Sequence, residues 1–174
     1  PSWESFMATP WEQRRDPAEL AAVRPDPNEV TLLMFTSGTT GEPKGVMLSH
    51  YNIGSNIEQM GQVFAFQRND RVLGVLPFFH VFANATVLNR TINNGGEIVM
   101  LPRFEAKAAL AAVNRTHVTS LPGVPTMYQA LLDCPDIGKT NFASLRACIS
   151  GGPPLPAELK ARFEPVSGAV VIEG

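Results

Sequence analysis

The segment from Thr36 to Gly45 (Thr-Ser-Gly-Thr-Thr-Gly-Glu-Pro-Lys-Gly) contains the residue types that bind phosphate. Its three glycines let the backbone turn tightly, so that several N–H groups can approach a ligand. Its four hydroxyl side chains add hydrogen-bond donors, and Lys44 adds a positive charge. A plain glycine-rich turn is the alternative, but such a turn needs neither the hydroxyls nor the lysine. We therefore predict a phosphate-binding loop.

The neighbours of Lys44 distinguish this loop from the Walker A pattern. That pattern requires glycine before the lysine and serine or threonine after it, whereas this chain has Pro43 and Gly45. Apolar runs lie on both sides of the loop, at residues 30–35 and 46–48. We therefore expect the loop to join two strands of a hairpin rather than a strand and a helix.

His80 is a second candidate for chemistry. It follows a strand candidate at residues 71–76 and precedes a helix candidate. In open α/β sheets, ligands bind beyond the carboxyl ends of the strands. On its residues alone, a histidine among aromatic side chains is more often a hydrogen-bonded structural residue, so both interpretations stay open at this point.

Gly151 and Gly152 also follow a strand candidate, at residues 146–149. Their small size would let a flat ring lie against the backbone. A plain turn between a strand and a helix that starts at Pro156 is the alternative. Pro153 has no backbone N–H and so removes one donor from this loop.

The remaining histidines and cysteines show no metal-ligand spacing. His50 fits a helix cap or a packing role, and His117 is expected to open a strand. Cys148 lies in an apolar run, where a thiol is usually a small core residue. No metal site is therefore predicted within the chain.

The elements that must position these residues follow an alternating order. Continuous apolar runs are typical of strands buried on both faces. Between these runs lie segments whose apolar residues recur at helical spacing. The pattern predicts an α/β fold with a mostly parallel sheet and helices on both faces. The six strand candidates are residues 30–35, 71–76, 97–101, 118–121, 146–149 and 169–172, and the helix candidates are residues 51–64, 105–115, 125–132 and 156–163.

Residues 1–29 differ in composition from the rest of the chain. They combine two tryptophans, a charged cluster and several prolines, with one short helix expected from Asp16 as its N-cap and Pro17 in its first turn. We interpret residues 1–29 as a connector and residues 30–174 as a domain.

Taken together, the motifs resemble those of the adenylate-forming (AMP-binding) superfamily and its acyl-CoA synthetases. Thr36 to Gly45 resembles the superfamily's signature loop, and three further segments match its later motifs in order and spacing. These segments are Leu-Pro-Phe-Phe-His-Val-Phe at residues 76–82, Leu-Pro-Gly-Val-Pro-Thr at residues 121–126 and Ser-Gly-Gly-Pro-Pro-Leu at residues 150–155. The resemblance covers residues 26–174 and implies one subdomain of the synthetase's large N-terminal domain.

The resemblance also implies substrates and roles. A carboxylic acid, expected to be a fatty acid, would be activated by ATP and Mg²⁺ as an acyl-adenylate and transferred to coenzyme A. Thr36, Lys44 and His80 would take part in catalysis, with His80 beside the carboxylate. The nucleotide and its phosphates would be bound by Thr36, Ser37, Gly38, Thr39, Thr40, Gly41, Lys44, Gly151, Gly152, Pro153, Glu173 and Gly174.

In that superfamily the magnesium carboxylate, a ribose-binding Asp and a catalytic Lys come later than Gly174. We therefore expect residues 30–174 to be a partial adenylation domain that is truncated at its C-terminal end and inactive alone. Two alternatives stay open: an adenylation domain that loads a carrier protein, and a non-catalytic nucleotide-binding or interaction module. The identity of the acid and of the thiol acceptor stays open as well.

Composition restricts the remaining partners. The net charge is −2, so no basic field indicates nucleic-acid binding. No run reaches the roughly 18 apolar residues of a membrane span, and no signal-peptide pattern is present. We expect a cytoplasmic location, which the two cysteines also fit.

Overall fold

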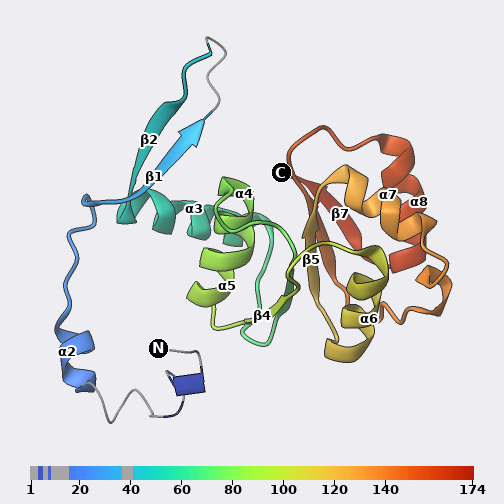
Figure 1. The fold of residues 1–174 in the computed structure, drawn as a ribbon, viewed down its shortest axis with the longest axis horizontal. Coiled ribbons are helices and arrows are strands. Elements are labelled where there is room, and N and C mark those ends of the chain that lie inside the picture. The colour runs from blue at the N-terminus through green and yellow to red at the C-terminus, as the bar shows by residue number, and fades with distance from the viewer. Residues whose placement is uncertain (1–3, 6–7, 9–15, 37–40) are drawn as a thin grey trace. The chain divides into compact units, whose positions relative to one another are not determined.

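The computed structural model describes residues 4–5, 8, 16–36 and 41–174, and it divides into two units, residues 1–51 and residues 52–174 (Figure 1). Each unit is described by itself. Within the described residues, no helix has the length and apolar character needed to cross a membrane.

The first unit contains the short helix α2 (Pro17–Ala22) and a hairpin of β1 (Val30–Thr36) and β2 (Lys44–Ser49). The predicted helix start is confirmed, because Asp16 Oδ1 accepts a hydrogen bond from the backbone N–H of Ala18 at 2.9 Å. The predicted hairpin is also confirmed: β1 and β2 pair antiparallel, with Thr36 opposite Lys44. Residues 30–35 were expected in the main sheet, and that expectation is wrong, because a connection this short allows only an antiparallel partner.

The second unit is built on a parallel sheet in the order β4-β3-β5-β6-β7. Its strands are β3 (Arg71–Gly74), β4 (Glu97–Met100), β5 (Ser120–Gly123), β6 (Ala147–Ser150) and β7 (Val170–Glu173). Its helices are α3 (His50–Val63, which begins in the first unit), α4 (Val81–Ala83), the π-helix η2 (Asn84–Asn89), α5 (Arg90–Asn93), α6 (Ala106–Thr116), α7 (Pro125–Asp133), the 3-10 helix η3 (Ile137–Lys139) and α8 (Ala157–Ser167). The α/β fold with a parallel sheet is thus confirmed.

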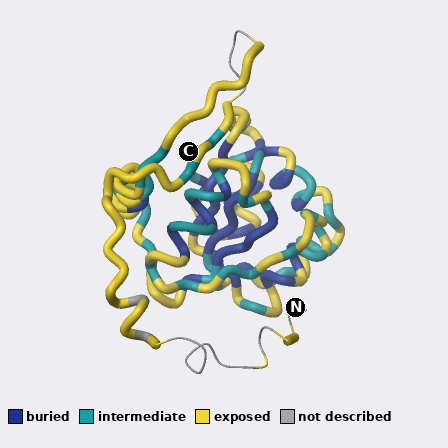
Figure 2. Tube along the Cα trace, turned by 60° about the vertical axis from the view of Figure 1, so that its left-hand side comes forward, coloured by how far each residue is buried: buried dark blue, intermediate teal, exposed yellow. Residues whose placement is uncertain are grey.

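Side chains on successive strand residues face opposite helix layers. Leu73 of β3 packs in the core formed with α6, α7 and α8, whereas its neighbour Val72 packs against Ala83 and Val87 of the α4–η2 stretch. Figures 1 and 2 show helices on both faces and buried residues gathered in the strands between them. The predicted coverage of both faces is confirmed.

A polar network closes the amino-terminal edge of this sheet. Asp70, only 2% exposed, precedes β3 and accepts hydrogen bonds from the backbone N–H of Gln67 at 2.7 Å, from Thr119 Oγ1 at 2.6 Å and from Arg146 Nη2. Thr119 lies just before β5 and Arg146 just before β6. One carboxylate therefore joins the starts of three neighbouring strands.

Two local expectations are wrong. His117 does not open a strand: it ends α6 in the left-handed conformation, with φ of 52°. β5 consequently begins at Ser120, two positions after the predicted start at residue 118, because the chain must first leave the left-handed turn.

Candidate functional site

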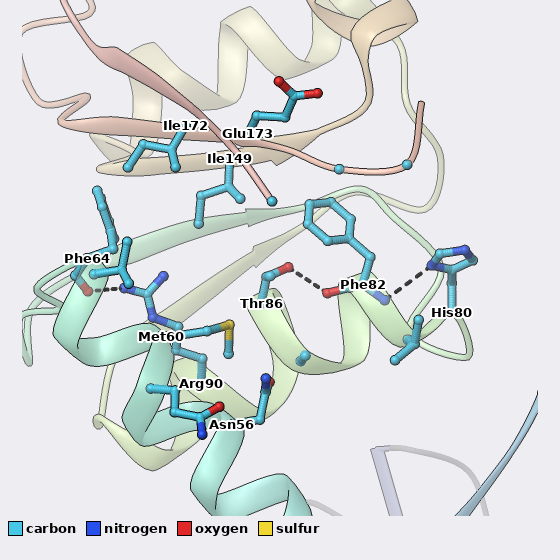
Figure 3. A pocket seen from close by; sticks show the side chains of 17 residues that line it. Asn56, Met60, Phe64, His80, Phe82, Thr86, Arg90, Ile149, Ile172 and Glu173 are labelled. Atoms are coloured by element: carbon cyan, nitrogen blue, oxygen red, sulfur yellow. Dashed lines mark hydrogen bonds between the residues drawn. The ribbon is translucent and has the colours of Figure 1, made fainter. Parts of the chain in front are cut away.

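A cavity of about 670 Å³ opens at the carboxyl ends of β6 and β7 (Figure 3). The walls that face these strands come from α3 and from the helical stretch α4–η2–α5. Most of the lining side chains are apolar, which suits an organic ligand rather than a free ion. The described lining residues are Asn56, Gln59, Met60, Val63, Phe64, His80, Val81, Phe82, Ala85, Thr86, Arg90, Ile149, Gly151, Gly152, Ile172, Glu173 and Gly174.

His80 lies at the start of the helical wall, as the N-cap of α4. Its Nδ1 accepts a hydrogen bond from the backbone N–H of Phe82 at 3.2 Å. A neutral imidazole bonded in this way carries its proton on Nε2. His80 is exposed and lines the cavity, so this geometry leaves an N–H donor for an acidic ligand.

The helical wall contains a π-helix where an α-helix would be expected. Thr86 Oγ1 donates a hydrogen bond to the carbonyl oxygen of Phe82 at 2.6 Å, and Asn89 Nδ2 donates to Asn84 Oδ1 at 2.7 Å. These side chains bridge the widened turn. Such single π-turns occur frequently at functional sites, and this one shifts Phe82 and Arg90 relative to the positions of a regular helix.

Gly151 makes a close approach with the helical wall. A Cβ atom at Gly151 would lie 2.5 Å from a ring carbon of Phe82, so any other residue here would displace that ring. The space that we predicted for adenine at Gly151 is therefore filled on that side by Phe82. A role for Gly151 in adenine binding stays a prediction.

The loop after β6 continues the wall. Gly152 has a φ of +86°, a conformation that glycine adopts without strain. Glu173 Oε1 accepts a hydrogen bond from the backbone N–H of Leu155 at 3.0 Å, and the N–H of Gly174 donates to the carbonyl oxygen of Ser150 at 2.9 Å. Glu173 therefore holds the loop in place against β7.

Arg90 is a further polar group of this cavity, and it was not predicted from the sequence. It is 2% exposed, and its Nη2 donates a hydrogen bond to the carbonyl oxygen of Phe64 at 2.6 Å. Its Nε is buried and has no hydrogen-bond partner among the described residues. Burial lowers the pKa of the guanidinium, and the positive charge of Arg146 adds to this, while Asp70 opposes it.

The predicted site residues divide into three groups. The structure brings His80, Gly151, Gly152, Glu173 and Gly174 to one cavity, and Pro153 continues its loop. Thr36, Gly41 and Lys44 lie in the hairpin unit. The predicted loop residues Ser37, Gly38, Thr39 and Thr40 lie outside the described residues.

Metal-ligand and thiol chemistry have little support in the part of the chain that is described. No three residues among His, Cys, Asp and Glu gather there as a metal site. Cys148 is fully buried, and burial raises the pKa of its thiol well above the ordinary value. The expected core role of Cys148 agrees with this placement.

Comparison with known proteins adds independent findings. The family described as AMP-binding enzyme matches residues 2–174. The long-chain-fatty-acid–CoA ligase of Bacillus subtilis is 38% identical over 149 residues, which cover 84% of this chain and 27% of that protein. The feruloyl-CoA synthase of an Amycolatopsis species is 39% identical over 136 residues, covering 78% of this chain and 28% of that protein.

Solved structures give the same picture. ATP-bound MatB from Rhodopseudomonas palustris is similar with a TM-score of 0.78 and 32% identity, covering 87% of this chain and 30% of that one. The N-terminal domain of FACL13 from Mycobacterium tuberculosis, with an inhibitor bound, is similar with a TM-score of 0.81 and 28% identity, covering 88% of this chain and 38% of that one. The chain thus spans well under half the length of the relatives it matches.

Proposed function

Because the chain belongs to the AMP-binding enzyme family, we propose that it forms part of an ATP-dependent acyl-CoA synthetase. In the first step, a carboxylate oxygen attacks the α-phosphorus of ATP, and the bond to pyrophosphate breaks. In the second step, the thiol of coenzyme A attacks the acyl carbon, and AMP leaves. A cytoplasmic location, where ATP and coenzyme A are available, is part of the same proposal.

The observation that carries this proposal is His80 at the mouth of a largely apolar cavity. Its Nε2–H can donate to a carboxylate oxygen and hold the acid for attack. The apolar walls can receive the acyl group, and a volume of about 670 Å³ is in the range of small-molecule sites. An acid held at both ends in this way would be oriented for attack, which is how positioning lowers the barrier.

ATP fits part of this site. The carboxyl-end loops of β6 and β7 meet at the cavity, which is where parallel α/β sheets bind nucleotides. Of the described lining residues, Glu173 alone carries a carboxylate, and that group accepts a hydrogen bond from the loop. We therefore assign no magnesium ligand to it. Mg²⁺, when bound with ATP, supplies charge neutralisation at the phosphates.

The hairpin loop supplies the phosphate contacts in this proposal, with Thr36 and Lys44 at its base. Both residues are exposed, and the Thr36 hydroxyl donates only a long hydrogen bond, of 3.5 Å, to the carbonyl oxygen of Lys44, so both side chains are accessible to a ligand. A charged hydrogen bond made in the transition state is worth about 1.5–3 kcal/mol. Removing the Lys44 ammonium should therefore slow adenylation roughly ten- to hundredfold.

The test is carboxylate-dependent exchange of pyrophosphate into ATP by the full-length protein, with a panel of fatty and aromatic acids. Lys44→Ala should lower the exchange rate and leave the fold intact. Lys107→Ala is the matched control, because Lys107 is also an exposed lysine and lies on α6. An unchanged rate in Lys44→Ala would refute the role of the loop, and no exchange with any acid would refute the proposed function. The 174-residue chain alone should show no exchange, since it spans about a third of its relatives.

A further inference from the structure

Arg90 has an unusual position for a charged side chain. It lies at the start of α5, is 2% exposed and lines the cavity deep along the helical wall. Its guanidinium carbon lies 4.9 Å from the ring centroid of Phe64 and 5.2 Å from that of Phe66. The bond from Nη2 to the Phe64 carbonyl fixes the plane of the group (Figure 3).

The surroundings of Arg90 satisfy this group only in part. Its Nε–H has no partner among the described residues. Asp70 is near enough to influence its charge, but that carboxylate already accepts hydrogen bonds from Gln67, Thr119 and Arg146. The charges of Arg90, Arg146 and Asp70 therefore sum to one positive charge. A buried N–H without an acceptor is costly, and buried charges are normally paired.

The Nε of Arg90 is covered by its surroundings, whereas Nη1 is not fully buried and has no hydrogen-bond partner among the described residues, so Nη1 is the donor that can reach a ligand in the cavity. We propose that Arg90 binds an oxygen at the far end of the acyl group, so that the preferred acids carry a hydroxyl, ketone or second carboxylate at their distal end. This inference rests on the proposed function, because it assigns the substrate class of the same cavity. Phe64 and Phe66 would hold the guanidinium in place while Nη1 donates to the substrate oxygen.

The geometry limits the length of such an acid. His80 and Arg90 stand ten positions apart on one helical stretch, which is about 15 Å at the α-helical rise. Side chains on one helical stretch lean in the same direction, so the separation is kept, and a hydrogen bond of about 2.9 Å at each end leaves on the order of 10 Å for the acid. A medium-chain acid spans that gap with its carboxylate at His80 and its distal oxygen at Arg90.

Discrimination between acids with and without a distal oxygen should be strong. A site built to hydrogen-bond a substrate oxygen rejects the analogue that lacks it, because the buried donor is then left unpaired. Decanoate, its ω-hydroxy analogue and its ω-carboxy analogue (sebacate) share a chain and differ only at the distal end. We expect kcat/KM in pyrophosphate exchange by the full-length protein to be at least about tenfold higher for one or both oxygenated acids than for decanoate. A larger gain for sebacate shows that charge is recognised, and a similar gain for both shows that the oxygen suffices.

Arg90→Leu should abolish or invert this preference, since an apolar end then fits best. Arg90→Lys, which keeps the charge without the planar fork, should retain part of the preference for sebacate. Arg103→Leu is the matched control, because Arg103 is an exposed arginine that does not line the cavity, and its ratio should stay as in the unaltered protein. The ratio is measured within one preparation, so partial unfolding cancels. If Arg90→Leu does not fold, Arg90→Lys and Arg90→Gln provide the same comparison.

The outcomes separate the two proposals. One result would overturn the role of Arg90 alone: the protein exchanges pyrophosphate with all three acids, prefers decanoate, and keeps the same ratio in the Arg90 variants. The acyl-CoA synthetase proposal would then stand. No exchange with any acid would overturn the proposed function and this inference together. A preference that Arg90→Leu removes supports both.

Discussion

Asp70→Asn tests whether one carboxylate holds the amino-terminal edge of the sheet together. Asp70 Oδ1 accepts from Thr119 and Arg146, and Oδ2 accepts from the backbone N–H of Gln67. An asparagine has one acceptor oxygen and one NH₂ group. Whichever way the amide turns, its NH₂ faces a donor, so at least one of these bonds is lost, and every remaining bond loses the negative charge.

The expected loss can be estimated from these bonds. A hydrogen bond to a charged group contributes about 1.5–3 kcal/mol. The side chain of Arg146 is 37% exposed, so water can replace part of what it loses. We expect the free energy of unfolding to fall by about 2 kcal/mol, from the lower half of that range. For a domain of this size, the melting temperature should fall by roughly 4–8 °C.

Dependence on pH gives a sharper test. Burial alone would raise the pKa of Asp70, but hydrogen bonds from Arg146, Gln67 and Thr119 outweigh it and hold the pKa below its usual value. A carboxylate with a lowered pKa stabilises the fold above the pKa of unfolded Asp, about 3.9, and this contribution is lost as pH falls through the folded pKa. The stability difference between the unaltered chain and Asp70→Asn should therefore be full at pH 7 and shrink below about pH 4.

Urea unfolding at several pH values measures this difference. Asp136→Asn is the control, because Asp136 forms an exposed pair with Lys139 at 3.6 Å, which should contribute less than about 0.5 kcal/mol. The reasoning is refuted if Asp70→Asn costs no more than the control at pH 7, or if its cost persists undiminished in acid.

Two further substitutions test the carboxyl edge of the sheet. In Gly151→Ala the new Cβ would meet the Phe82 ring at 2.5 Å, so the ring must turn into the cavity. KM for the acid should then rise in pyrophosphate exchange. The loss in urea unfolding should be about 1 kcal/mol, the low end for overpacking, because Phe82 is only half-buried. Phe82→Leu in the same chain should reverse the rise in KM. A larger loss of stability than of affinity would contradict this. Tyr128→Phe removes a hydroxyl that donates towards the carbonyl oxygens of Leu121, at 2.9 Å, and Ile149, at 3.0 Å. The free energy of unfolding should fall by about 1–2 kcal/mol. No change in the urea midpoint would show that water replaces the hydroxyl.

The parallel sheet was predictable because its strands are buried on both faces. Cys148 and Val171 pack in the core with α6–α8, while their neighbours Ile149 and Ile172 face the cavity. Both positions must therefore be apolar, and the sequence shows a continuous apolar run rather than an alternating one. The end of each such run also located His80, Gly151 and Glu173 at one edge of the sheet.

Other features depend on contacts that one sequence does not display. A non-glycine residue in the left-handed conformation, such as His117, leaves no mark on apolar spacing. The π-turn between Asn84 and Asn89 keeps the composition of an ordinary helix. Arg90 was missed because arginine is rarely fully buried, although its place three residues after the buried Val87 was a sign that this side of the helix faces inward.

The two edges of the sheet differ in how well their polar groups are satisfied. At the amino-terminal edge, the buried carboxylate of Asp70 has three hydrogen-bonded partners. The buried side-chain atoms without a partner among the described residues are Arg90 Nε, Thr91 Oγ1 and Ser150 Oγ, in and beside the segments that line the cavity. A fold selected for stability alone would satisfy such groups with its own atoms. All three atoms are covered by their surroundings, so the unsatisfied polar atoms of the described residues lie beside the cavity, whereas the Asp70 carboxylate at the opposite edge is satisfied within the fold.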